Sequence, residues 1–169
     1  CTVRDGVVID RRAGRIETKE TERLCALISQ AIPEIEGVKL IIRPGKSHRF
    51  AIIFRGGHLS DKLTDADPHK DNRPVAYSSP KSAEAEFSSI LTNTFIKKVQ
   101  ELLKDEKVAN GVLLRGFSVK PDIPTFTTRY KMNALAIATY PMYRGIAKVL
   151  GMDVKEEPKD YDEMVKILK

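Results

Sequence analysis

Several features that would point to common classes of protein are missing from this 169-residue chain. It has no tryptophan and only 7% aromatic residues, which leaves little material for stacking nucleic-acid bases. Its two cysteines, Cys1 and Cys25, are not in C-x-x-C spacing and have no second pair, which excludes a cysteine zinc site. No apolar run approaches the roughly 18 residues that a membrane-spanning helix needs.

Sequence motifs of common enzymes are missing as well. The chain contains no G-x-x-x-x-G-K-[ST], no G-x-G-x-x-G and no G-x-S-x-G. No Ser/His/Asp arrangement indicates a nucleophile. The N-terminal stretch CTVRDGVVIDRR has neither the basic nor the apolar region of a signal peptide. Two unpaired cysteines fit a reducing, cytoplasmic setting.

The composition describes a globular domain with a basic surface. Hydrophobic residues make up 41% of the chain, enough for a core, and the length suits one domain. The net charge is +6, which permits an anionic partner such as phosphate, nucleic acid or lipid headgroups without choosing among them. A stand-alone nucleic-acid-binding domain needs clustered cations with interleaved aromatics, whereas this chain spreads its charges. We keep that class as the alternative function.

Strand-like and helix-like segments alternate along the chain. β-branched runs between Gly and Pro residues predict strands, and apolar residues at i, i+3, i+4, i+7 predict helices. The predicted strands are 6–10, 37–45, 49–56, 111–119 and 133–139, and the predicted helices are about 18–32, 81–106, 140–150 and 159–168. The pattern predicts an α/β fold, a layered sheet of about four to five strands with helices. We expect 37–56 to form a hairpin and 133–139 to be buried on both faces.

Two further expectations concern the first helix and the ends of the chain. Cys25 falls among the apolar positions of the helix that Thr18 can cap, so we expect a buried thiol. The chain starts at Cys1 and ends at Lys169 inside a predicted helix. We therefore expect it to be a piece of a longer protein.

The segment DRRAGR, residues 10–15, follows the first predicted strand. It places Arg11, Arg12 and Arg15 at one turn, where Gly14 lets the backbone bend close to a ligand. A guanidinium group presents a planar fork that binds phosphate or carboxylate through two hydrogen bonds. The segment is either such an anion site or a solvated charge cluster in which Asp10 pairs with an arginine.

Three other segments hold polar clusters. In RPGKSHRF, residues 43–50, His48 stands beside Lys46 and Arg49 at a hairpin tip. This tip is either part of a functional site or a polar surface that serves only solubility. Arg115 lies near the end of a predicted strand, and Arg144 lies near the start of a predicted helix, where an anion can bind. Plain helix capping is the alternative at that helix start.

The loop LSDKLTDADPHK, residues 59–70, concentrates titratable side chains. Asp65, Asp67 and His69 stand at i, i+2, i+4 and allow three interpretations. They can ligate a metal, form a polar network that orients a ligand or relays protons, or cap the backbone of an ordered turn. A small metal enzyme built on these residues is a third function class.

Four segments in order resemble one family. DGVVIDRRAGRI (5–16), LSDKLTDADPHK (59–70), VLLRG (112–116) and AIATYPMYRGIAKVLGM (136–152) resemble the archaeal-type, cofactor-independent (2,3-bisphosphoglycerate-independent) phosphoglycerate mutases. Order and spacing agree across nearly all of the chain. The resemblance implies interconversion of 3-phosphoglycerate and 2-phosphoglycerate through a phosphoserine, in glycolysis and gluconeogenesis.

The resemblance also implies a domain organisation. The family's catalytic domain resembles alkaline phosphatase, and a second domain is inserted into it. We expect residues 1–131 to be the inserted, substrate-gripping domain and residues 132–169 to begin the returning catalytic domain. The serine nucleophile and the divalent metal site, usually manganese, would lie outside this chain, with no 2,3-bisphosphoglycerate required. The fragment alone is expected to be inactive, and its partners are phosphoglycerate and the rest of the catalytic domain, not nucleic acid or a membrane.

The resemblance implies roles for the polar residues already described. Asp67 and His69 are the expected catalytic residues, which would orient glycerate hydroxyls or assist proton transfer. The expected substrate-binding residues are Arg11, Arg12, Arg15, His48, Asp65 and Arg144. We expect no metal ligand in this chain.

Overall fold

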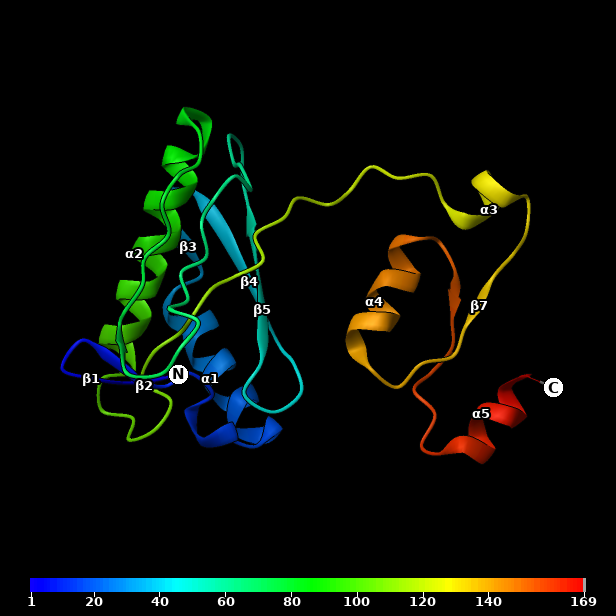
Figure 1. Ribbon diagram of the computed structural model, residues 1–169, viewed down its shortest axis with the longest axis horizontal. Coiled ribbons are helices and arrows are strands. Elements are labelled where there is room, and N and C mark those ends of the chain that lie inside the picture. The colour runs from blue at the N-terminus through cyan, green and yellow to red at the C-terminus, as the bar shows by residue number, and fades with distance from the viewer. Residues whose placement is uncertain (169) are drawn as a thin grey trace. The chain divides into compact units, whose positions relative to one another are not determined.

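The computed structural model describes residues 1–168, and they form two compact units that divide between Val119 and Lys120 (Figure 1). Each unit combines helices with short strands, which confirms the predicted α/β class. None of the helices in the described residues has both the length and the apolar character needed to cross a membrane.

The first unit holds two small antiparallel sheets and two long helices. One sheet has the order β1-β2-β6 and the other the order β3-β4-β5. The elements are β1 Thr2–Arg4, β2 Val7–Asp10, α1 Thr18–Ala31, β3 Glu34–Ile35, β4 Val38–Pro44, β5 Phe50–Arg55, β6 Arg73–Pro74 and α2 Glu86–Leu102, with short 3-10 turns at Ala13–Arg15 and Ala83–Ala85.

The hairpin of β4 and β5 is the centre of this unit. Side chains of a strand alternate between its two faces, and Val38, Leu40 and Ile42 of β4 are buried while their neighbours are more exposed. The register pairs Leu40 with Phe54 and Ile42 with Ile52, which directs the partly buried side chains of β5 to the same face. The predicted hairpin is therefore confirmed.

Helices α1 and α2 cover that face of the sheet and complete the core (Figure 1). Phe95 of α2 is fully buried and meets Phe54 edge to face, with ring centroids 6.0 Å apart. Cys25 is buried, as predicted. The core cluster consists of Leu24, Cys25, Ile28, Ile32, Ile35, Val38, Leu40, Ile42, Ala66, Leu91, Phe95, Ile96, Val99, Leu103, Val112 and Leu114.

One predicted cap has a different role. α1 begins at Thr18, but no side chain caps its first turn. The Thr18 hydroxyl instead accepts a hydrogen bond from the backbone N–H of Ser47, at 3.0 Å, and so ties the helix to the hairpin tip.

The expectation of one sheet of four to five strands is corrected by the topology. The strands divide among two three-stranded sheets and one two-stranded sheet. The segment predicted as a strand at 111–119 pairs only through an isolated bridge between Ala66 and Leu114. Gly116 follows with φ +69°, a left-handed conformation that ends the extended backbone.

The second unit contains three helices and a pair of parallel strands. These elements are α3 Phe126–Tyr130, β7 Leu135–Ala136, α4 Pro141–Val149, β8 Asp153–Val154 and α5 Tyr161–Leu168. Strand β7 pairs with β8 only and its Leu135 is 43% exposed, so the prediction of a strand buried on both faces at 133–139 is wrong for the described residues. The predicted helices at 140–150 and 159–168 are confirmed, with α4 beginning at Pro141 after the cap residue Tyr140.

We expect Phe95→Ala to lower the free energy of unfolding by about 3–5 kcal/mol, because truncating a buried aromatic leaves a cavity. Chemical denaturation measures the change. Ile90, on the same helix but 56% exposed, is the matched control, and Ile90→Ala should cost less than about 0.5 kcal/mol. Equal effects at the two positions would contradict this description of the core.

Candidate functional site

Asp10, at the end of β2, shapes the turn that carries Arg11, Arg12 and Arg15, which we call the arginine turn. Its carboxylate accepts hydrogen bonds from the backbone N–H groups of Arg12 (2.7 Å) and Gly14 (2.6 Å). These hydrogen bonds lower the pKa of Asp10. Asp10 therefore binds the backbone and not an arginine side chain, so the pairing expected for a charge cluster does not form, and Arg12 and Arg15 are exposed. An anion site at this turn stays a prediction.

The tip of the β4–β5 hairpin sits on the chain that follows this turn. Ser47 donates its backbone N–H to Thr18 and its hydroxyl to the carbonyl of Ile16, at 3.0 and 3.2 Å. The Ser47 carbonyl accepts a hydrogen bond from the Thr21 hydroxyl at 2.7 Å. The neighbouring residue, His48, is thereby held close to the arginine turn.

Burial and surrounding positive charge act together on His48. Desolvation lowers the pKa of its imidazole first, and the charges of Arg49, the N-terminal ammonium, Arg12 and Arg15 lower it further. A histidine of ordinary pKa is already mostly neutral at pH 7, so His48 is a neutral imidazole there. The charges of Arg12 and Arg15 thus act on the hairpin tip, and the role of His48 in a site stays a prediction.

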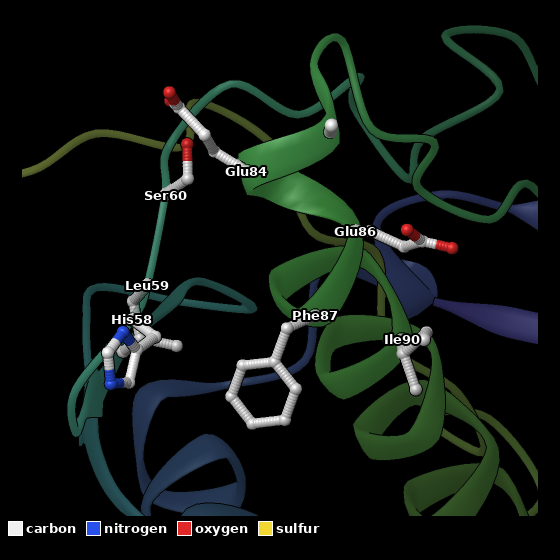
Figure 2. A pocket seen from close by; sticks show the side chains of 8 residues that line it. His58, Leu59, Ser60, Glu84, Glu86, Phe87 and Ile90 are labelled. Carbon is white, nitrogen blue, oxygen red and sulfur yellow. The ribbon is translucent and has the colours of Figure 1, made fainter.

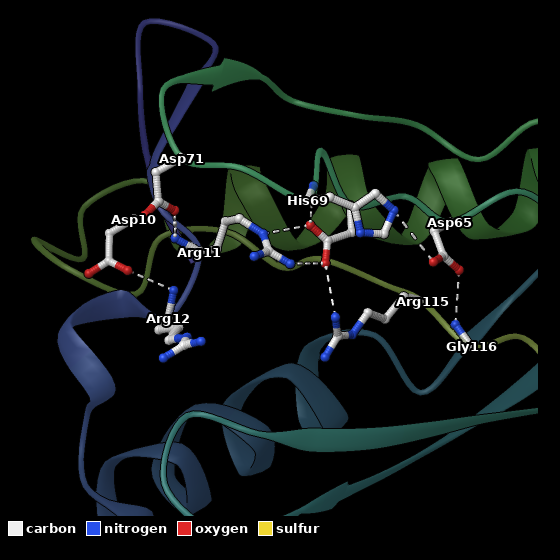
Figure 3. A network of polar contacts seen from close by, with 9 residues as sticks. Asp10, Arg11, Arg12, Asp65, His69, Asp71, Arg115 and Gly116 are labelled. Carbon is white, nitrogen blue, oxygen red and sulfur yellow. Dashed lines mark hydrogen bonds and ion pairs between the residues drawn. The ribbon is translucent and has the colours of Figure 1, made fainter.

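Arg11 points to the loop between β5 and α2. Its Nε and Nη2 donate to the two carboxylate oxygens of Asp67, at 2.8 and 2.6 Å. The Asp67 side chain is 3% exposed and that of Arg11 is 21% exposed. The backbone N–H of Arg11 also donates to Asp71 at 2.9 Å, so the end of β2 is bound to the loop at two points (Figure 3).

The Asp67 carboxylate remains charged because of these neighbours. Burial alone would raise its pKa, but the hydrogen bonds from Arg11 and from the His69 backbone, together with the charges of Arg11 and His69, lower it overall. The His69 N–H donates to Asp67 at 2.9 Å, and His69 itself has φ +60°. Left-handed backbone is uncommon for a residue other than glycine, although the exposed His58 also adopts it, with φ +58°.

Asp65 joins the loop to the segment after Leu114. It accepts the backbone N–H of Gly116 at 3.0 Å, and its other oxygen lies 3.7 Å from Nε2 of His69 (Figure 3). Ala66 and Leu114 exchange two backbone hydrogen bonds, at 2.7 and 3.2 Å. The loop therefore has fixed partners at three consecutive residues.

These bonds also bring Arg115 to the site. Its Nη1 lies 3.8 Å from Asp67 Oδ2, and its side chain is 64% exposed. The sequence analysis named Arg115 as an anion-binding candidate because it follows an apolar run. No sequence signal indicated that Arg115 would lie near Asp67.

The three open interpretations of the loop can now be compared. Both oxygens of Asp67 are bound by Arg11, and within residues 1–168 no three His, Cys, Asp or Glu side chains are arranged to hold a metal ion. Asp65, Asp67 and His69 therefore do not fit a manganese site. They form a salt-bridged polar network, and Asp67 and Asp65 also accept the backbone N–H groups of His69 and Gly116, as the turn-capping interpretation predicts. A role of this network on a ligand stays a prediction.

Arg144 belongs to the second unit. Its Nη1 donates to the carbonyl of Ala138 at 3.1 Å, at the start of α4. A role for Arg144 in the site of the first unit stays a prediction.

A pocket of about 660 Å³ lies apart from these residues, at the start of α2. Leu59, Phe87 and Ile90 give it apolar walls, and His58, Glu84 and Glu86 lie at its edge (Figure 2). It contains none of the residues selected from the sequence. The polar network is therefore the stronger candidate site.

Comparisons with known proteins agree with one another. Residues 1–109 match the family of 2,3-bisphosphoglycerate-independent phosphoglycerate mutases. A probable 2,3-bisphosphoglycerate-independent phosphoglycerate mutase of Thermotoga sp. strain RQ2 is 46% identical over 163 residues, which cover 96% of this chain and 41% of that protein. The probable enzyme of Aquifex aeolicus is 44% identical and is covered to 38%. The chain thus spans about two fifths of the length of these relatives.

The fold is similar to that of a solved enzyme. The cofactor-independent phosphoglycerate mutase of Thermoplasma acidophilum matches with a TM-score of 0.72 at 28% identity, over 99% of this chain and 48% of that one. The PH0037 protein of Pyrococcus horikoshii shares the fold, with a TM-score of 0.58 at 20% identity.

We expect Arg11→Gln to lower the free energy of unfolding at pH 7 by about 3 kcal/mol, because it leaves a buried carboxylate without its cation. A carboxyl group with a lowered folded pKa stabilises the protein fully above its unfolded pKa, about 3.8 for Asp67. That contribution is lost as the pH falls from there through the folded pKa. Denaturation curves of the variant and the wild type should therefore converge in this acidic range.

The matched control is Lys62→Gln in the same loop. Lys62 pairs with Glu84 at 3.4 Å, with both side chains largely exposed, so its loss should cost less than about 0.5 kcal/mol. An Arg11→Gln effect as small as this, or one that persists unchanged in acid, would show that the pair does not stabilise the fold.

Proposed function

Since the chain belongs to the family of 2,3-bisphosphoglycerate-independent phosphoglycerate mutases, we propose that it supplies the substrate-gripping part of an enzyme that interconverts 3-phosphoglycerate and 2-phosphoglycerate. The reaction, which the resemblance implies to run through a phosphoserine, belongs to glycolysis and gluconeogenesis. We accordingly propose a cytoplasmic enzyme. Its partners would be phosphoglycerate and the rest of the catalytic domain, with neither nucleic acid nor a membrane.

The observation that carries this proposal is the pair of exposed arginines beside a fixed polar loop. Phosphoglycerate is a small molecule with a phosphate, a carboxylate and a hydroxyl group. Arg12 and Arg15 offer forked donors for the two anionic groups, and His48 lies in the electrostatic field of both. His69, held by the network, is of a residue type that orients hydroxyls and transfers protons, while Asp67, with both oxygens bound by Arg11, would act through its hold on His69.

The other selected residues have weaker support. Asp65 accepts the Gly116 N–H with one oxygen, and its other oxygen lies 3.7 Å from His69 Nε2, so it would act beside His69. Arg144 would bind substrate from the second unit, as its motif implies. Neither assignment has a contact in this structure that distinguishes it from a structural role.

The machinery for breaking the phosphate ester would lie outside this chain. The described residues carry anion-binding groups, but Asp65, Asp67 and His69 do not fit the divalent metal that the resemblance implies. A metal, manganese in our proposal, and the serine nucleophile of an alkaline-phosphatase-like domain would come from the rest of the protein. The relatives are more than twice as long as this chain, which leaves room for such a domain.

We also propose a domain organisation that follows the resemblance. Residues 1–131 would form the inserted domain, and residues 132–169 would begin the returning catalytic domain. The two compact units separate earlier, between Val119 and Lys120. Residues 120–131, which this proposal assigns to the inserted domain, belong to the second unit, where the Phe126 N–H donates to the Leu150 carbonyl at 2.7 Å.

In the full-length enzyme, Arg12→Gln and Arg15→Gln should each raise the KM for 3-phosphoglycerate by about 10-fold or more, because a hydrogen bond to a charged group contributes about 1.5–3 kcal/mol. Steady-state mutase assays with added Mn²⁺ measure this. Lys39→Gln removes the same charge from an exposed position on β4 and should leave KM unchanged. No mutase activity in the wild type, or equal KM values in all three variants, would refute the proposed function.

His69→Ala should lower kcat by about 10-fold or more, the lower range of what a positioned acid or base contributes. His58 is the matched control, since it is exposed and shares the left-handed backbone, with φ +58° against +60° for His69. His58→Ala should keep the wild-type kcat. A normal rate for a correctly folded His69→Ala enzyme would exclude His69 from the chemistry.

A further inference from the structure

We infer that Arg11, unlike its neighbours in the same motif, holds Asp67 and through it His69, and does not bind the ligand. The inference rests on the proposed function, because it assigns a role within the same site. The sequence pattern predicts the same role for Arg11, Arg12 and Arg15, whereas this inference gives Arg11 a different role from the other two.

The three arginines of the turn have different surroundings. Arg12 and Arg15 are exposed, and no acidic side chain within residues 1–168 forms a salt bridge with either. Arg11 is largely covered, and two of its guanidinium nitrogens are bound to Asp67 at 2.8 and 2.6 Å. Its backbone is fixed to Asp71 as well. Arg11 is therefore directed into the protein while the other two face outward.

The bond from Arg11 continues to His69 through a single atom. Asp67 Oδ1 accepts from Arg11 Nε at 2.8 Å and from the His69 backbone N–H at 2.9 Å. That second bond restrains His69 in a left-handed conformation, with φ +60°. The position of the carboxylate, which Arg11 sets, thus sets the position of the His69 backbone.

Releasing Arg11 to a ligand would be unfavourable. The Asp67 side chain is 3% exposed, and a buried carboxylate that loses its partner is strongly destabilising. Arg115 is not a substitute, because its nearest nitrogen is 3.8 Å from Asp67 and its side chain is 64% exposed. The Arg11–Asp67 pair is therefore expected to remain intact when the ligand is bound.

The test compares Arg11→Gln and Arg12→Gln in the full-length enzyme. Loss of a ligand-binding group raises KM, whereas loss of a group that only places His69 lowers kcat. We expect Arg11→Gln to lower kcat by about 10-fold or more with KM within about 3-fold of wild type, and Arg12→Gln to raise KM. A raised KM with an unchanged kcat for Arg11→Gln would overturn the inference.

Two further variants guard against a folding defect. Arg11→Lys keeps the charge but provides a point charge instead of the planar fork, so its kcat should lie between those of wild type and Arg11→Gln. The double variant Arg11→Gln with Asp67→Asn replaces the ion pair by two neutral amides. If Arg11 acts through Asp67, its kcat should equal that of Asp67→Asn alone, and a multiplied loss would contradict the inference.

A measurement without substrate separates this inference from the proposed function. Amide hydrogen exchange of a peptide covering residues 67–72 should be faster in Arg11→Gln than in wild type, and unchanged in Arg12→Gln. Unchanged exchange in Arg11→Gln would overturn the inference whatever the enzyme's substrate. A wild-type enzyme without mutase activity would refute the proposed function, and the exchange result would still decide the role of Arg11.

Discussion

The candidate site depends on one ion pair, between Arg11 at the end of β2 and Asp67 in the loop that precedes α2. The pair joins segments 56 residues apart in sequence, and it gives the buried Asp67 carboxylate a cationic partner. Asp67 then holds His69, while Asp65 and Ala66 hold the segment that carries Arg115. A loop with little regular structure is thereby given a defined conformation, as a binding surface for a small charged ligand requires.

The aspartates and the arginines of the site have different roles. Aspartates shape it: Asp10 binds the backbone of the arginine turn, Asp71 binds the backbone of Arg11, and Asp65 binds that of Gly116. With their carboxylates used in this way, the exposed guanidinium groups of Arg12 and Arg15 remain available for an external anion. This arrangement is the basis on which we propose that the chain binds an anionic substrate.

The sequence predicted what depends on local pattern and missed what depends on distant pairing. Alternating apolar residues were enough to place the β4–β5 hairpin, and helical spacing placed the face of α2 that carries Phe95. The segment 111–119 was wrongly predicted as a strand, because its apolar run meets the loop at Ala66 and turns at Gly116. The cluster of titratable residues was visible in the sequence, but the pairing of Asp67 with Arg11 was not, since no local signal joins residues so far apart.

The most direct test of this account is a crystal structure of the full-length protein with 3-phosphoglycerate bound. We predict that the phosphate and carboxylate of the ligand lie within hydrogen-bonding distance of the guanidinium groups of Arg12 and Arg15, with the two hydrogen bonds between Arg11 and Asp67 unchanged. A ligand bound away from the arginine turn would contradict the proposed function. A ligand bound to an Arg11 that has separated from Asp67 would contradict the role assigned to the ion pair.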